Sequence, residues 1–238
     1  MAGSLIRPLS SRLLPGAGRR SIALLACLGL AALTACSAAF GLLHRAPAEV
    51  APAAAKARVA VFLGDSYTVG FGGGGYVTRT AQELGWTAVA RGQSGTGYVN
   101  PSEVTGQSVY GDRVAELVAV HPGIVVVQGS TNDLGRPIGA IAIAARELYA
   151  QLARTLPDAK LVVLGPLAPP GVAQKDIGLI RDVLADAAHD AGLAFIDPIA
   201  QGWLQPPSGL FVDGVHPNDA GYAELADHLV AALRALGI

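Results

Sequence analysis

Val59-Ala60-Val61-Phe62-Leu63-Gly64-Asp65-Ser66 is the stretch that decides the fold of this chain. It is a short, wholly apolar run that stops at Gly64, a pattern typical of a central strand buried on both faces. In open α/β sheets, active sites lie in the crevice beyond the carboxyl ends of the strands. Asp65 and Ser66 come directly after this strand, so Ser66 stands where a nucleophile would be held on a rigid scaffold.

Beyond this strand, short apolar runs alternate with longer segments of helical spacing. We predict further strands at 86–90, 124–127, 161–164 and 193–196, and helices at 76–84, 112–120, 138–156, 173–191 and 217–236. Such alternation is typical of a parallel sheet with helices on both faces. We therefore expect one α/β domain over residues 58–238, a three-layer αβα sandwich around a central five-stranded parallel sheet. Right-handed crossovers would bring the carboxyl ends of its strands to one edge.

Charge is unevenly distributed along the chain. Residues 1–45 hold five arginines and no acidic residue, so 12 of the 17 basic side chains and all 18 acidic ones belong to residues 46–238. The later part of the chain is therefore mildly acidic, and it lacks the clustered basic face that nucleic-acid binding requires. The last cysteine of the chain is Cys36. Residues 46–238 therefore contain no cysteine, which excludes a disulfide, a thiolate metal site and a cysteine nucleophile there.

The N-terminal segment 1–45 is typical of export rather than of a folded domain. Residues 21–43 are uncharged and follow Arg19-Arg20 directly. The stretch Leu33-Thr34-Ala35-Cys36 resembles a bacterial lipobox, in which Cys36 would be lipidated. An uncleaved membrane anchor, or a secretory signal cleaved near residues 46–48, fits the same stretch. In each case the domain would be extracytoplasmic, and an Ala/Pro-rich linker at 46–57 would tether it to the membrane in the first two.

Near the C-terminus, Asp213-Gly214-Val215-His216-Pro217 contains the partners that a nucleophilic serine needs. We expect Pro217 to be the first residue of the last helix, which would place His216 at the mouth of that helix. Asp213 can then accept a hydrogen bond from Nδ1 of His216, leaving Nε2 free to take a proton from Ser66.

The same chemistry needs donors for the oxyanion that develops during attack on a carbonyl. Asn132 follows the third strand, and its side-chain amide can point into the crevice. Gly95 follows the second strand and can offer an unobstructed backbone N–H, as can Ser66 itself. With Ser66, His216 and Asp213, these donors would complete an acyl-transfer site.

Taken together, these motifs resemble the SGNH hydrolase superfamily, also called the GDSL esterase/lipase family. The matching blocks are Gly64-Asp65-Ser66, the Gly95 loop, Asn132-Asp133 and Asp213-Gly214-Val215-His216. The resemblance implies a flavodoxin-like fold over residues 58–238. It also implies Ser66 as nucleophile, His216 as base, Asp213 as the acid that orients it, and Ser66, Gly95 and Asn132 as the oxyanion hole.

Two blocks depart from the family pattern. Ser130 occupies the position that is usually glycine two residues before Asn132, which leaves the backbone angle there open. In the second block Gly92, Gly95 and Gly97 compete for the donor role, and we choose Gly95 from its Ser-Gly-Thr setting. We interpret Asp65 and Asp133 as acceptors of backbone N–H groups rather than as catalytic acids.

Several other features receive structural interpretations. Residues 70–75 match the Gly-any-Gly-any-any-Gly pattern of dinucleotide-binding loops. The match begins six residues after the strand, however, and four consecutive glycines readily match this pattern by chance. We expect no cofactor and no metal. Residues 197–215 are the best candidate for a lid or substrate wall. The aromatic residues that could line the crevice are Phe71, Tyr76, Tyr98, Trp203 and Phe211.

The sequence thus predicts a serine hydrolase that cleaves carboxylic esters, with short acyl groups favoured and a small-molecule or carbohydrate ester as substrate. The first alternative is an O-acyltransferase or deacetylase acting on cell-envelope carbohydrate. The second is a catalytically inactive binding domain.

Overall fold

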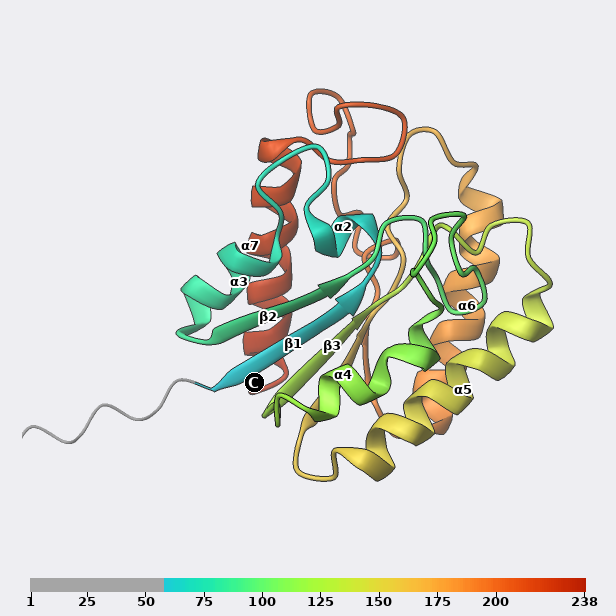
Figure 1. Ribbon diagram of the computed structural model, residues 1–238. Coiled ribbons are helices and arrows are strands. Elements are labelled where there is room, and N and C mark those ends of the chain that lie inside the picture. The colour runs from blue at the N-terminus through green and yellow to red at the C-terminus, as the bar shows by residue number, and fades with distance from the viewer. Residues whose placement is uncertain (1–57) are drawn as a thin grey trace, which may run out of the picture. The chain divides into compact units, whose positions relative to one another are not determined.

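The computed structural model describes residues 58–238 (Figure 1). The expected export or anchor segment 1–45, with Cys36, and the linker 46–57 lie outside the described residues. Among residues 58–238, no helix has the length and apolar character needed to cross a bilayer.

The core is a sheet of five strands: β1 (Val59–Gly64), β2 (Thr87–Gly92), β3 (Ile124–Gln128), β4 (Lys160–Leu164) and β5 (Ala194–Ile196). All neighbouring strands pair in parallel, in the order β2-β1-β3-β4-β5. The predicted five-stranded parallel sheet is therefore confirmed, and its strand order is that of the flavodoxin-like sheets. The order changes direction at β1 and β3, so the crevice that such a sheet offers to ligands lies where these two strands end.

Helices cover both faces of the sheet: α2 (Ser66–Val69), α3 (Val77–Leu84), α4 (Val114–Val118), α5 (Ile138–Thr155), α6 (Gln174–Asp190) and α7 (Asp219–Ala235), with a 3₁₀ turn η1 (Tyr110–Arg113) before α4. Figure 1 shows α3 and α7 on one side and α4, α5 and α6 on the other. The alternation of side chains along β1 explains both layers. Val61 and Leu63 belong to the cluster with α5 and α6, whereas Ala60 and Phe62 belong to the cluster with α7.

Two local expectations differ from the structure. The helix expected at 112–120 begins as η1, and its α-helical part, α4, is only five residues long. The other difference is α2, a four-residue helix immediately after β1 that the sequence pattern did not predict. So short a helix contains barely one turn, which leaves no periodicity to read.

Candidate active site

Ser66 lies at the carboxyl end of β1 as the first residue of α2. Asp65 is the N-cap of α2, and its Oδ1 accepts the backbone N–H of Tyr67 at 2.9 Å. The Asp65 carboxyl group is fully buried, and this burial raises its pKa to about 7. Asp65 therefore acts as a cap that fixes the turn into α2, in agreement with its structural interpretation, and Ser66 is left at the crevice with 5% of its surface exposed.

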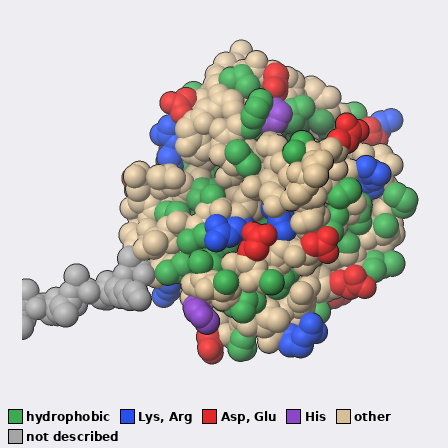
Figure 2. All heavy atoms as spheres, in the orientation of Figure 1, with side chains coloured by type: hydrophobic (Ala, Val, Ile, Leu, Met, Phe, Trp, Pro, Cys, Tyr) green, Lys and Arg blue, Asp and Glu red, His purple; other side chains and the backbone are tan. Residues whose placement is uncertain are grey.

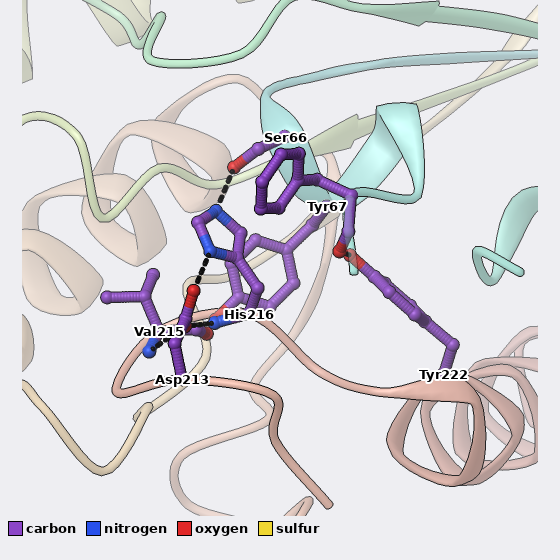
Figure 3. A network of polar contacts seen from close by, with 7 residues as sticks. Ser66, Tyr67, Asp213, Val215, His216 and Tyr222 are labelled. Atoms are coloured by element: carbon purple, nitrogen blue, oxygen red, sulfur yellow. Dashed lines mark hydrogen bonds and ion pairs between the residues drawn. The ribbon is translucent and has the colours of Figure 1, made fainter. Parts of the chain in front are cut away.

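His216 and Asp213 approach Ser66 from the far end of the chain (Figure 3). Nε2 of His216 lies 3.1 Å from Oγ of Ser66, and Nδ1 of His216 lies 2.9 Å from Oδ2 of Asp213. The other oxygen of Asp213 accepts the backbone N–H groups of His216 at 2.6 Å and of Val215 at 2.7 Å. The N–H of His216, the ring contact to His216 and the N–H of Val215 lower the pKa of Asp213 to about 2. Asp213 is thus an ionised acceptor, which favours a proton on Nδ1 and leaves Nε2 free to accept from Ser66.

The position of Pro217 corrects one expectation. The last helix begins at Asp219, and its N-cap is Asn218, whose side chain accepts the N–H of Gly221 at 3.0 Å. Pro217 instead forms an antiparallel bridge with Phe211, next to a hydrogen bond at 2.9 Å from the N–H of Val212 to the carbonyl of His216. His216 is therefore held in extended chain before the helix. The reason is that an Asn side chain caps a helix and Pro217 does not.

The aromatic residues near the site divide into two groups. Tyr76, Tyr98 and Trp203 are buried in the core, and Trp203 stacks on His228 with ring centroids 5.1 Å apart. The expectation that these three side chains line the crevice is therefore wrong. Phe71 does lie at the site, with its ring centroid 4.5 Å from that of His216. Tyr67 was not singled out from the sequence. It donates its hydroxyl hydrogen to the carbonyl of Val215 and braces the loop that carries His216 (Figure 3).

The three expected oxyanion donors lie at the ends of neighbouring strands β1, β2 and β3. Nδ2 of Asn132 donates one hydrogen to the carbonyl of Thr96 at 2.9 Å, and its second hydrogen remains for another acceptor. Within residues 58–238, the backbone N–H groups of Ser66 and Gly95 donate to no other protein group. Three donors are therefore open at one edge of the sheet.

The structure also distinguishes the three glycines of the second block. A Cβ on Gly92 would lie 2.6 Å from the backbone nitrogen of Val69, and one on Gly97 would lie 2.4 Å from the carboxylate of Asp133. These two glycines permit close packing, and the N–H of Gly97 is engaged with the carbonyl of Asn100 at 2.8 Å. Gly95 has φ of +77° and leaves its N–H open, which favours it over the other two.

Asp133 braces the loop that carries Gly95. Its carboxylate accepts the backbone N–H groups of Tyr98, Val99 and Asn100 at 2.8, 3.1 and 3.0 Å. Burial raises the pKa of this carboxyl group. Asp133 therefore joins the loop after β3 to the loop after β2, a structural role like the one expected from the sequence.

The backbone at Ser130, where the family pattern has glycine, accommodates a side chain. Among residues 58–238 its φ is not one of the positive values, so a side chain is tolerated there. Its Oγ donates to the carbonyl of Thr96 at 3.1 Å and accepts the N–H of Asn132 at 3.0 Å. The serine hydroxyl thus helps to orient the backbone of Asn132.

A comparison with protein families decides the classification. The model of the GDSL-like lipase/acylhydrolase family matches residues 62–224, a span that contains all five candidate site residues. The chain belongs to this family. A GDSL lipase of Mycobacterium tuberculosis is 35% identical over 181 residues, which cover 70% of this chain and 78% of the relative. The protein is an SGNH-type ester hydrolase, as the motifs predict.

Solved structures share the GDSL fold at lower sequence identity. A G-D-S-L family protein from Desulfitobacterium hafniense is 18% identical with a TM-score of 0.61, over 73% of this chain and 98% of that one. A family two carbohydrate esterase from Clostridium thermocellum, in complex with cellohexaose, is 22% identical with a TM-score of 0.63. That match covers 76% of this chain and 65% of the esterase. At these identities the likeness establishes the fold.

Arg113 is a buried residue of this GDSL hydrolase that sequence reasoning missed. Only 1% of its surface is exposed, and its guanidinium donates to the carbonyls of Arg91 and Gly64 at 3.0 and 3.1 Å and to Oγ1 of Thr96 at 3.3 Å. These acceptors belong to the ends of β1 and β2 and to the Gly95 loop. An arginine in an amphipathic segment normally faces solvent, and no local signal marks this one as buried.

A pocket of about 610 Å³ adjoins the open donors. Gly95 and Asn132 line it, together with four other polar or charged residues: Asn100, Ser102, Glu103 and Arg136. Residues 197–215, the expected substrate wall, have two other roles. Trp203 is buried in the core, and the end of the segment supports His216. Gly171 donates its N–H to the carbonyl of Gly214 at 2.6 Å, which ties the Pro-rich loop after β4 to the loop that carries Asp213 and His216. Among residues 58–238, no cluster of three or more His, Cys, Asp or Glu side chains could hold a metal ion.

Proposed function

We propose that this GDSL hydrolase cleaves carboxylic esters through an acyl-enzyme on Ser66. The observation that carries the proposal is the contact chain Ser66–His216–Asp213, with separations of 3.1 and 2.9 Å. As Oγ of Ser66 bonds to the carbonyl carbon, Nε2 of His216 takes its proton and the carbonyl electron pair moves to oxygen. When that pair returns, the alcohol leaves and takes the proton from His216.

Deacylation reverses these roles with water. His216 removes a proton from water, the hydroxide bonds to the acyl carbon, and Oγ of Ser66 leaves with the proton that His216 returns. The developing negative charge on the carbonyl oxygen would be stabilised by the open N–H groups of Ser66 and Gly95 and by Nδ2 of Asn132. The exposed position of Asp213 supports access of water to this site.

Short acyl groups fit this site better than long ones. The pocket beside Gly95 and Asn132 is lined in part by Asn100, Glu103 and Arg136, and a long alkyl chain would displace water from these polar side chains. Carbohydrate esters are supported as a substrate class by the structural likeness to a family two carbohydrate esterase and to an acetyl xylan esterase. Transfer of the acyl group to a sugar hydroxyl instead of water remains the alternative, and the products distinguish the two.

We further propose that the hydrolase domain is exported and attached to the membrane through residues 1–45. The uncharged run 21–43 after Arg19-Arg20, with Cys36 in a lipobox-like setting, supports this location. Labelled palmitate incorporated by the wild type and not by a Cys36→Ala variant would support lipidation. Equal incorporation in both would contradict it, and fractionation of the Cys36→Ala variant then separates an uncleaved anchor from a cleaved signal.

The function is tested by hydrolysis of p-nitrophenyl acetate, butyrate and laurate by the 238-residue chain, alone and with a soluble sugar added as acceptor. We expect turnover to fall from acetate to laurate, with free acid as the product in both conditions. Turnover that rises toward laurate would contradict the short-acyl proposal. Acylated sugar as the main product would favour transfer, and the absence of turnover by the folded protein with every ester would contradict both.

A further inference from the structure

Phe71 contacts the imidazole of His216 and is nevertheless exposed to solvent. Its ring packs on the imidazole of His216, with centroids 4.5 Å apart and planes inclined by 56°. Yet 53% of its surface is exposed, as is 52% of Val212 on the neighbouring loop. Figure 2 shows hydrophobic side chains gathered beside a histidine near the top of the face that is drawn. Solvent-facing apolar surface beside a reactive group often marks a binding site.

The backbone of Phe71 is firmly anchored. Its N–H donates to the carbonyl of Ser66 at 3.0 Å, and its own carbonyl accepts the hydroxyl hydrogen of Tyr222 at 2.9 Å. A Cβ on the next residue, Gly72, would lie 2.8 Å from a methyl carbon of Val212, so the loops of Phe71 and Val212 are closely packed. The exposed ring is therefore presented on rigid chain.

The chemistry of the reaction assigns a side of the substrate to this surface. His216 must deliver its proton to the oxygen of the leaving alcohol, so that alcohol has to lie beside His216. Phe71 packs on the ring of His216, and the N–H of Val212 donates to the carbonyl of His216 at 2.9 Å, so both residues lie next to it. The polar pocket lies instead beside Gly95 and Asn132, the candidate donors to the carbonyl oxygen, and none of Phe71, Val212 and His216 lines it. The alcohol and acyl parts of the ester thus face surfaces of different character.

We propose that Phe71 and Val212 form a platform that binds the alcohol part of the ester, and that this alcohol is a sugar ring; the proposal rests on the esterase function proposed above. A pyranose has one face of C–H groups, which packs on an aromatic ring, and a rim of hydroxyl groups, which needs polar surroundings. The platform offers one aromatic ring and one isopropyl group, and the residue after Val212 is Asp213, whose side chain is 48% exposed. An alkyl alcohol would need a longer apolar surface than these two side chains provide.

The simpler role for Phe71 is to restrain the imidazole of His216. The two roles predict different kinetics. A residue that only positions His216 affects kcat for every ester alike, because all of them use the same imidazole. A residue that binds the alcohol affects KM, and only for esters whose alcohol reaches the platform.

The test compares two acetate esters that differ only in the alcohol, a monoacetylated methyl glucoside and ethyl acetate. We expect Phe71→Ala to lower the preference for the sugar ester about two- to tenfold, mainly through KM, and Phe71→Trp to restore it. Ile143→Ala is the matched control, because Ile143 is a similarly exposed hydrophobic residue (59%) on α5, outside the site. An equal fall in kcat for both esters, or an unchanged preference, would overturn the platform.

A binding measurement keeps this test separate from the esterase function. Methyl glucoside, the alcohol product, is titrated into the wild type, Phe71→Ala and Ile143→Ala proteins, and the shifts of their NMR resonances are followed. We expect weak binding by the wild type and by Ile143→Ala, and a loss of affinity in Phe71→Ala. Absence of binding, or equal binding by all three, would overturn the platform even if no ester were hydrolysed.

Discussion

One carboxylate, that of Asp213, holds both the backbone and the ring of His216. Oδ1 of Asp213 accepts the N–H of His216 at 2.6 Å, while Oδ2 lies 2.9 Å from its Nδ1. The three-residue spacing makes this double contact possible, because the chain between the two residues forms a tight turn whose N–H groups point at the carboxylate. The Asp-any-any-His motif therefore fixes the imidazole to its own loop, while Tyr67 and Gly171 fix that loop to the rest of the fold.

This relationship predicts the result of Asp213→Asn. Asparagine can keep the backbone acceptor, but its amide NH₂ would face Nδ1 and favour the wrong tautomer of His216. We expect kcat to fall about 10²-fold, less than for a deeply buried triad acid, because 48% of the Asp213 side chain is exposed and water can partly replace it. Steady-state kinetics with p-nitrophenyl acetate measure the effect, and thermal unfolding checks the fold. A loss of less than about threefold would contradict the orienting role.

Asp65 predicts a pH dependence of stability. Its pKa is about 7 in the folded protein, against an ordinary value of 3.8, so the folded state binds more protons than the unfolded state between these values. Stability from this group is therefore greatest at low pH and declines as pH rises from about 4 to about 7. In the wild type this group should lower the free energy of unfolding by about 3 kcal/mol between pH 5 and pH 8. We expect this decline to be absent in Asp65→Asn, whose side chain can still cap α2. Urea unfolding of both proteins at pH 5 and pH 8 measures it, and parallel pH profiles would refute it.

Gly171 and Gly178 form a matched pair for testing how the His216 loop is supported. A Cβ on Gly171 would lie 2.6 Å from the carbonyl oxygen of Gly214, whereas one on Gly178, within α6, meets nothing within 4 Å. We expect Gly171→Ala to displace the loop that carries Asp213 and His216 and to lower kcat about tenfold or more. Gly178→Ala should keep full activity and gain up to about 1 kcal/mol of stability. Equal activity of the two variants would show that the contact at Gly171 does not position the loop.

Substitutions of the neighbours Asn132 and Asp133 are expected to affect different properties, kcat for Asn132 and stability for Asp133. Asn132→Ala removes a candidate oxyanion donor, so kcat should fall about 10²- to 10³-fold while the free energy of unfolding changes little. Asp133→Ala leaves the N–H groups of Tyr98, Val99 and Asn100 without their acceptor, which should cost about 2–4 kcal/mol of stability. Kinetics and urea unfolding of both variants separate the two roles. Similar losses of stability in the two would contradict this division.

The sequence was informative where local chemistry determines structure. The apolar runs of β1 and β3 predicted buried parallel strands, and the alternation with helices predicted the three layers. It was less informative where tertiary packing decides. Trp203 packs in the core cluster that includes α7, and the buried Arg113 donates to carbonyls of β1 and β2 and to the hydroxyl of Thr96. Helix α7 starts two residues later than the predicted position at Pro217, because the side chain of Asn218 caps it.

The central claim is that Ser66 is activated by His216, and its most direct test is covalent labelling with a fluorophosphonate probe. The wild type, Ser66→Ala and His216→Ala proteins are treated with the probe, and the labelled peptide is identified by mass spectrometry. We expect one label on Ser66 in the wild type, none at that position in Ser66→Ala, and strongly slowed labelling in His216→Ala. A folded wild type that does not react, or a Ser66→Ala variant that reacts as readily, would contradict the account.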